Sequence, residues 1–318
     1  MNLSDLTVLT EAATGNYVYT SIVAALAGAK KVYAYAESSK YGSREEVSRN
    51  TMKLADCLGI ENIEVIFKKS MQCVAESDII TNSGFVRPIN AYMIDAMKPT
   101  AVIPLMYDAW EFRPSDINIE KCVEKGILVL GTKERLLELY PASGYLALKL
   151  LFESGLEVYK SNVLILGDGI IGRNITKVLS EFGMNLTPSM LDVEAIIVSD
   201  LISDKLHISE QGAIDPVHLS KINPNVKIIH ICGNINADEV KRAGLSLIPD
   251  SPAPRGYMSY SADYLGPKFT IALNTASLKV GECMARCRLD GMDIKKTIDY
   301  CLENSFASEL KGVFRNES

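Results

Sequence analysis

The sequence predicts an α/β protein built from two doubly wound parallel sheets, and three observations support this. Short apolar runs alternate with amphipathic segments along most of the chain, a pattern typical of the strands and helices of a parallel sheet. The length of 318 residues exceeds what one hydrophobic core usually serves, so two domains are expected. Residues 163–172 read VLILGDGIIG, which predicts a strand that ends in a glycine turn and leads into a helix.

The first predicted domain, residues 1–132, is flavodoxin-like. Its strands are expected at 7–9, 32–35, 63–67, 78–81, 101–106 and 127–130. Its helices are expected at 17–28, 43–59 and 91–97, and Ser43 and Glu46 have the spacing of a capping box at the start of the second helix. The carboxyl ends of parallel strands meet at one edge of the sheet, where ligands bind in such folds.

The rest of the chain predicts a linker, a second domain and a return to the first. A leucine-rich segment interrupted at Pro141 predicts a linker helix over 133–154. The second domain, 155–272, is expected to be Rossmann-like, but abbreviated, because too few residues separate Met190 from Ala195 for the usual helix and strand. Its other elements are expected at 173–182, 184–187, 195–199, 217–222, 226–231 and 245–248. A proline-rich loop over 249–267 precedes helices at 274–289 and 293–304, so residues 273–318 are expected to pack on the first domain.

The glycine turn predicts a phosphate-binding site. Gly167, Gly169 and Gly172 have the G-x-G-x-x-G spacing, which provides a tight turn, a close backbone approach to a pyrophosphate and close packing of helix on strand. A phosphate would lie at the helix N-terminus, where unpaired N–H groups and the helix dipole favour an anion. The alternative is a turn that joins strand to helix without a ligand.

A weaker form of this pattern occurs near the start of the chain. Gly15 follows the first predicted strand, and Glu37 ends the second, where an acid could hold a ribose hydroxyl. The sequence leaves open whether this segment binds a ligand or is an ordinary βαβ unit.

Residues 167–173, followed by Phe182, Gly183 and Met184, resemble the nucleotide-binding domain of the D-2-hydroxyacid dehydrogenase and formate dehydrogenase-like superfamily. Residues 219–229 are similar to a later helix and strand of that domain. The resemblance implies NAD or NADP as the cofactor. The residues that it implies as cofactor contacts are Gly167, Asp168, Gly169, Ile170, Ile171, Cys232 and Gly233.

The chain departs from this superfamily at three places. Met190 stands where an acid would hold the adenine ribose, with Asp192 two residues later. Cys232 stands where a catalytic arginine would precede the glycine, and residues 250–256 contain Arg255 but no histidine. The 2-hydroxyacid chemistry of the superfamily is therefore not expected to carry over.

Polar residues that follow predicted strands are the candidates for substrate binding and catalysis. The candidates for substrate binding are Asn82, Ser83, Arg87 and Tyr107, because a guanidinium among polar groups suits a carboxylate or a phosphate. The candidates for catalysis are Asp108, Glu111, His230 and Arg255, as proton carriers or as contacts to an anion. The structural alternatives are a solvated loop at 82–88, an ion-paired corner at 107–113, a buried histidine at 230 and a simple connector around 255. His207 and His218 are expected at the surface.

The composition argues against several classes of protein. The chain has 33 Lys and Arg against 39 Asp and Glu, a net charge of -6, which argues against a nucleic-acid partner. Without a bilayer-spanning apolar stretch or a secretory signal pattern, a cytoplasmic protein with no membrane partner is expected. The 7 cysteines are expected to be free thiols; Cys283 and Cys287, four apart on a predicted helix, are expected to be structural, with no metal site.

These observations predict an NAD(P)-dependent oxidoreductase that acts on a small polar or carboxylate-bearing substrate held between the domains, in a protein that forms homodimers. Two alternatives stay open. One is a Rossmann-type enzyme that catalyses no redox reaction, and the other is a non-catalytic protein that binds a nucleotide or another ligand.

Overall fold

The computed structural model describes residues 1–157 and 159–315, which form two compact units. Unit 1 comprises Met1–Leu137 and Pro267–Ser318, and unit 2 comprises Glu138–Gly266. Each unit has a largely parallel sheet with helices on both faces, which confirms the predicted fold class. The sequence-based domain limits of 132, 154 and 272 stay predictions. Among the described residues, no helix combines the length and the apolar character needed to cross a membrane.

The sheet of unit 1 has seven strands in the order β14-β6-β5-β4-β1-β2-β3. The strands are β1 Thr7–Glu11, β2 Lys31–Tyr35, β3 Ile63–Ile66, β4 Ile79–Ile80, β5 Val102–Pro104, β6 Leu128–Thr132 and β14 Ala307–Glu309. The first six are parallel, and β14 pairs antiparallel with β6. The parallel strands follow the 3-2-1-4-5-6 order of dinucleotide-binding folds. The flavodoxin order is 2-1-3-4-5, so the doubly wound parallel sheet is as predicted but its flavodoxin-like strand order is not, because β3 extends the sheet beyond β2. The order reverses between β1 and β4, so these two strands form the switch point of unit 1.

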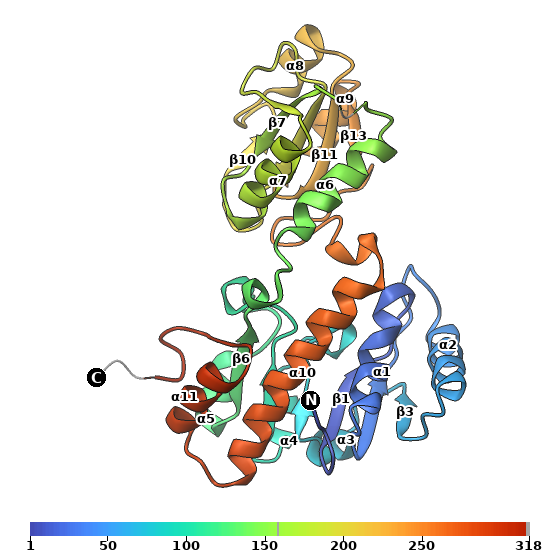
Figure 1. The fold of residues 1–318 in the computed structure, drawn as a ribbon, viewed down its shortest axis with the longest axis vertical. Coiled ribbons are helices and arrows are strands. Elements are labelled where there is room, and N and C mark those ends of the chain that lie inside the picture. Colours follow the sequence, from blue (N-terminus) through green and yellow to red (C-terminus); the bar gives the residue numbers. More distant parts are fainter. Residues whose placement is uncertain (158, 316–318) are drawn as a thin grey trace. The chain divides into compact units, whose positions relative to one another are not determined.

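Helices cover both faces of this sheet because neighbouring strand residues point to opposite sides. Helices α1 Tyr19–Leu26, α2 Arg44–Cys57, α10 Pro267–Leu289 and α11 Ile294–Asn304 share one core cluster with Val8. Helices α3 Met71–Glu76, α4 Ala91–Ala96 and α5 Ile119–Lys125 share the other with Leu9. Figure 1 shows the long helix α10 beside α1, so the C-terminal helices pack on the first sheet as predicted. Short 3-10 turns lie at Gly15–Val18, Gly84–Val86, Ala109–Glu111 and Glu134–Leu137.

Helix α10 begins earlier than the sequence predicted. The expected start was residue 274, but the helix begins at Pro267. Proline is well suited to the first turn of a helix, because its fixed φ matches the helix and it has no N–H to leave unpaired. Pro267, which the sequence predicts at the end of the preceding loop, is therefore the first residue of the helix.

The sheet of unit 2 has five parallel strands in the order β13-β11-β9-β7-β8. They are β7 Asn162–Leu166, β8 Asn185–Leu186, β9 Ala195–Ser199, β11 Lys227–Cys232 and β13 Ser246–Ile248, and a small parallel pair joins β10 Leu206–Ile208 to β12 Asn234–Ile235. No helix or strand lies between β8 and β9, as the short spacing predicted. The order reverses between β7 and β9, the switch point of unit 2.

The helices of unit 2 also divide between the two faces (Figure 1). Helices α6 Ala142–Glu153 and α7 Ile170–Glu181 share one core cluster with Val163 and Ile197. Helices α8 Pro216–Ile222 and α9 Ala237–Arg242 pack on the other face. A 3-10 turn lies at Ala262–Leu265.

Candidate functional site

The glycine turn between β7 and α7 has the backbone that its spacing predicted. Gly167 has a φ of 125°, and a Cβ there would lie 2.8 Å from the carbonyl carbon of Ser199. A Cβ on Gly172 would lie 1.9 Å from the carbonyl oxygen of Gly167. Only glycine fits these two positions, because a side chain would collide with rigid backbone.

Gly169 has a different environment from its two neighbours. Its φ is -65°, and a Cβ there would meet no described atom within 4 Å. It caps α7 without a side-chain hydrogen bond, and the first turn of the helix contains no acidic residue. The turn therefore presents backbone N–H groups beside open space, which is the arrangement that binds a phosphate.

Arg173 stabilises this turn from the helix side. Its guanidinium donates a hydrogen bond of 2.7 Å to the carbonyl oxygen of Asp168. This contact places a positive charge near the N-terminus of α7, which adds to the attraction for an anion.

The end of β11 approaches the same place. Gly233 has a φ of 132°, and a Cβ there would lie 2.8 Å from Val198 Cγ1 and 3.4 Å from the carbonyl oxygen of Asp200. Gly167 and Gly233 therefore contact the end of β9 from its two sides. Of the predicted cofactor residues, the structure places Gly167, at the switch point of unit 2, and Gly233 on either side of residues 198–200.

The position expected for the ribose contact contains no carboxylate. Thr187 and Ser189 follow β8, and the Ser189 amide donates to the Thr187 hydroxyl. Asp192 lies at the amino-terminal ends of the strands, away from the glycine turn, because its backbone carbonyl oxygen accepts a hydrogen bond from the Asn162 side chain at the start of β7. Asp192 therefore cannot replace the missing acid, and Met190 packs against the core.

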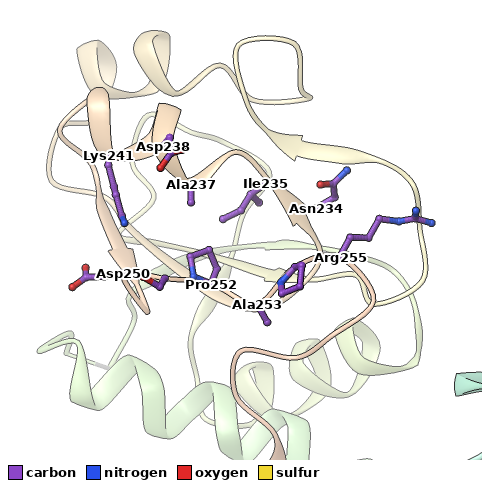
Figure 2. Close-up of a pocket in the computed structure, with 12 residues that line it drawn as sticks. Asn234, Ile235, Ala237, Asp238, Lys241, Asp250, Pro252, Ala253 and Arg255 are labelled. Atoms are coloured by element: carbon purple, nitrogen blue, oxygen red, sulfur yellow. The ribbon is translucent and has the colours of Figure 1, made fainter. Parts of the chain in front are cut away.

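A pocket of about 450 Å³ opens beyond β11 and β13 (Figure 2). Asp238 and Lys241 project toward it from α9, and the chain that follows β13 forms another wall. Arg255 lies at its rim and forms an exposed ion pair with Asp204. Charged groups of both signs beside the apolar Ile235 suit a small polar ligand.

His230, a predicted catalytic residue, lies inside unit 2. Its side chain is fully buried, its Nδ1 lies 2.7 Å from Ser259 Oγ and its Nε2 lies 3.0 Å from the carbonyl oxygen of Gly233. Ser259 Oγ also accepts a hydrogen bond of 2.8 Å from the Ala253 amide. Burial lowers the pKa of His230, so the ring is neutral. Through Ser259 and Ala253 it links the segment after β13 to β11. Proton transfer would require at least one of its hydrogen bonds to break.

His207 was expected at the surface, and this prediction is wrong. Its side chain is 2% exposed, and its Nε2 lies 2.9 Å from Oδ2 of Asp200, which directly follows β9. Strand β10 pairs with β12 in a separate two-stranded sheet, and the Asp200 carboxylate contacts the His207 ring inside unit 2. His218 is exposed, as expected. An acid directly after a buried strand was the only signal in the sequence for the Asp200–His207 pair.

In unit 1, the predicted substrate residues Asn82 and Ser83 lie at the end of β4. Asn82 Oδ1 accepts a hydrogen bond of 2.8 Å from the Met106 amide, and both side chains are buried. The hydroxyl oxygens of Thr10, Thr81 and Ser83 lie 2.7 to 3.2 Å apart. The ends of β1 and β4 therefore form a buried polar cluster at the switch point of unit 1.

Arg87 and Tyr107 meet at a residue that the sequence did not single out, Asp116. The Tyr107 hydroxyl donates to Asp116 Oδ2 at 2.9 Å, and Arg87 and Arg113 lie 3.0 and 3.2 Å from the same oxygen. Burial would raise the pKa of Asp116, but the two guanidiniums and the hydroxyl hold it below its usual value. The carboxylate therefore stays ionised and orders both candidates.

The acids near the carboxyl ends of the unit 1 strands include Asp108, Glu111, Glu134 and Glu11, of which the sequence singled out only the first two as candidates for catalysis. Burial and the nearby Asp108 raise the pKa of Glu111 to about 7, against the effect of Arg113. Glu134, which follows β6, has a raised pKa because of burial and its acidic neighbours. A proton therefore stays on part of this cluster near neutral pH.

The fourth acid, Glu11, ends β1. Its carboxylate lies over Gly84, where a Cβ would come within 1.5 Å of Oε2. Burial raises its pKa to about 7, although Arg87 and the Phe85 amide oppose the shift. The acid fills the switch point of unit 1, which makes this crevice less suited to a phosphate than the open turn of unit 2. An acid at the end of an apolar strand was the signal in the sequence.

No protein-family model matches the chain. No curated protein matches its sequence. Among solved structures, a subunit of dipicolinate synthase from Bacillus halodurans is similar, with a TM-score of 0.55 and 9% identity over 90% of this chain and 99% of the other. This match shows a shared fold.

Two dehydrogenases give weaker matches. The NAD-dependent formate dehydrogenase from Staphylococcus aureus, solved with NAD, has a TM-score of 0.43 and 12% identity over 84% of this chain and 98% of the other. The NAD-bound 3-phosphoglycerate dehydrogenase of Entamoeba histolytica has a TM-score of 0.44 and 13% identity over 91% and 97%.

Proposed function

We propose that this protein is an NAD(P)-dependent oxidoreductase that acts on a small polar or carboxylate-bearing substrate. The observation that carries the proposal is the turn at Gly169, where uncapped backbone N–H groups face open space at the switch point of a parallel sheet. The tight contacts of Gly167 and Gly172 hold that turn in one conformation.

Four features of unit 2 fit a dinucleotide. The amides after Gly169 would hold the pyrophosphate, and Arg173 would add positive charge beside them. Gly233 keeps the end of β11 free of a side chain, and the adjoining pocket would take a further part of the ligand. When bound, the nicotinamide supplies the hydride chemistry.

The residues of unit 1 fit a substrate and a proton carrier. We assign Glu111 as the group that exchanges the proton, because a pKa of about 7 lets it give and take a proton near neutral pH. We assign Asn82, Ser83 and Arg87 to substrate binding, since amide, hydroxyl and guanidinium groups recognise a carboxylate. Asp116 would keep the Arg87 side chain in place.

Calorimetric titration with NADH and NADPH, followed by turnover assays on 2-oxo acids, aldehydes and imines, tests the proposal. Binding with turnover of one class supports it. Binding without turnover would favour the non-catalytic alternative, and no binding of either nucleotide at millimolar concentration would overturn the proposal.

The Gly15 segment is the alternative location for the nucleotide, and paired substitutions decide between the two turns. Gly15→Val and Gly169→Val place a bulky side chain in each turn, and a Cβ meets no described atom within 4 Å at either glycine. Because the φ of 58° at Gly15 strains a valine there, binding is compared only after circular dichroism shows that both variants are folded. We expect only Gly169→Val to abolish nucleotide binding. Loss of binding only in Gly15→Val would transfer the site to unit 1.

We also infer a cytoplasmic homodimer. No disulfide joins the cysteines of the described residues, which suits a reducing compartment. Sedimentation equilibrium tests the dimer, and localisation of a tagged protein tests the compartment.

A further inference from the structure

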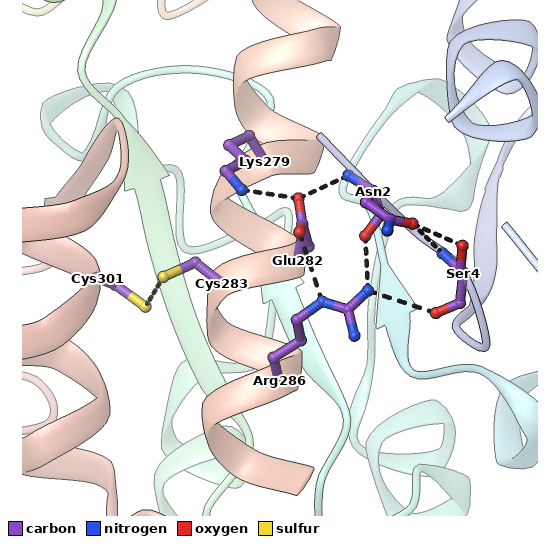
Figure 3. A network of polar contacts seen from close by, with 7 residues as sticks. All are labelled: Asn2, Ser4, Lys279, Glu282, Cys283, Arg286 and Cys301. Carbon is purple, nitrogen blue, oxygen red and sulfur yellow. Dashed lines mark hydrogen bonds and ion pairs between the residues drawn. The ribbon is translucent and has the colours of Figure 1, made fainter. Parts of the chain in front are cut away.

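Three cysteines meet between the last two helices of unit 1. Cys283 and Cys287 lie on α10, and Cys301 lies on α11. Their sulfur atoms all lie within 4.8 Å of one another, and the three side chains are buried. Figure 3 shows Cys283 and Cys301 facing each other, with the two sulfurs 3.1 Å apart.

The local fold explains this convergence. Residues four apart lie on the same face of a helix, so Cys283 and Cys287 present their sulfurs side by side. Asp293 caps α11 by accepting a hydrogen bond from the Lys296 amide, and α11 then packs along α10. This packing brings Cys301 to the two sulfurs of α10.

The three sulfurs lie close enough together to hold one metal ion after a small adjustment. Metal–thiolate bonds are about 2.3 Å long, so three thiolates around one ion lie about 4 Å apart. The sulfurs all lie within 4.8 Å of one another, and the 3.1 Å between Cys283 and Cys301 has to widen by roughly 1 Å when an ion binds. Sulfur ligands favour soft ions such as zinc, cadmium and copper(I) over magnesium or calcium.

The nearest acid on α10 takes part in a different network. Glu282 accepts from Lys279 at 3.0 Å and from the Asn2 amide at 3.1 Å, and Arg286 lies 3.4 Å from its other oxygen (Figure 3). Because both Glu282 oxygens already have partners, this carboxylate does not serve the cluster, and the three thiols provide its ligand atoms.

We propose that Cys283, Cys287 and Cys301 bind one thiophilic metal ion of the class that includes zinc, cadmium and copper(I). The ion displaces one proton from each thiol and forms three metal–sulfur bonds, with no oxidation or reduction. The site is independent of the proposed nucleotide site, because all of its ligands lie on α10 and α11.

Cadmium titration of the reduced, full-length protein tests the proposal. We expect one equivalent to produce a sulfur-to-cadmium charge-transfer absorption, and zinc to compete for the same site. Cys283→Ser, Cys287→Ser and Cys301→Ser should each weaken binding by more than the roughly 10–100-fold cost of losing an outer-shell partner. Cys73→Ser is the matched control, because Cys73 is a buried thiol on α3 outside the cluster.

Native mass spectrometry of the wild-type protein gives a test that does not depend on the folding of any variant. The expected mass increase equals one cadmium less the displaced protons. Absence of a one-to-one complex, or equal cadmium affinity in the wild type and in the folded cluster variants, would overturn the proposal. A Cys283–Cys301 disulfide in protein kept under reductant would also overturn it, because two ligands would be lost.

Discussion

Substitution of Gly169 by alanine should separate nucleotide binding from folding. The glycine has a φ of -65°, which alanine adopts freely, and the added Cβ would meet no described atom within 4 Å. We therefore expect the free energy of unfolding to change by no more than about 1 kcal/mol, because restriction of the unfolded chain by alanine opposes the poorer N-cap preference of alanine at this position.

The same methyl group occupies the space that a phosphate would enter. A hydrogen bond to a charged group contributes about 1.5–3 kcal/mol. Loss of one such bond from the turn weakens binding by about 10- to 150-fold, because each 1.4 kcal/mol corresponds to a factor of ten in Kd. Calorimetric titration with the nucleotide that the wild type binds measures this change.

Two other glycines provide the controls. Gly172→Ala should destabilise unit 2 by about 1–3 kcal/mol, because its Cβ would lie 1.9 Å from a backbone oxygen. Gly183→Ala, just beyond the C-terminal end of α7, should cost stability through its φ of 80° and leave Kd unchanged. An unchanged Kd in folded Gly169→Ala would refute the assignment of the turn as the phosphate site.

Three further substitutions test other parts of the structure by urea unfolding. Burial raises the pKa of Glu11 from 4.5 to about 7, so its ionisation destabilises the fold above neutral pH. Glu11→Gln should therefore stabilise the protein there by roughly 3 kcal/mol. Equal effects of this substitution on the free energy of unfolding at acidic and alkaline pH would contradict this. Glu282 keeps a low pKa despite burial, because Lys279 and its other partners favour the carboxylate. Glu282→Ala should cost about 3 kcal/mol of stability at neutral pH and less as the pH falls through the lowered pKa. A loss of stability that does not depend on pH would argue against the role of the Glu282 charge. Gly144→Ala places a Cβ 2.4 Å from Val178 on α7 and should cost about 1–3 kcal/mol; no loss would show that α6 and α7 adjust freely.

Local patterns in the sequence were sufficient for the elements that bury a continuous apolar run. The strand at 162–166 agrees with the expected strand, and the helix after the glycine turn begins at 170, three residues before the expected 173. Strand, turn and helix lie within twenty residues, and each has its own signal. The strand expected at 245–248 is likewise observed, as β13 Ser246–Ile248, and it ends where the sequence predicts the proline-rich loop.

Elements that depend on distant partners were missed. Strand β14 has only three residues, Ala307–Glu309, and exists because it pairs with β6, far earlier in the chain. His207 carries no local sign of burial, and its environment comes from the pairing of β10 with β12. Pairing across long separations has no periodic signature in the sequence.

The candidate sites also combine features that the sequence predicts with features that depend on tertiary packing. The sequence by itself determined the glycine turn, because the spacing of Gly167, Gly169 and Gly172 is a local property of the backbone. Only the tertiary structure decided that Gly169 faces open space and that Cys301 joins the pair on α10. Such proximities arise when separate elements pack together, and no spacing along the chain encodes them.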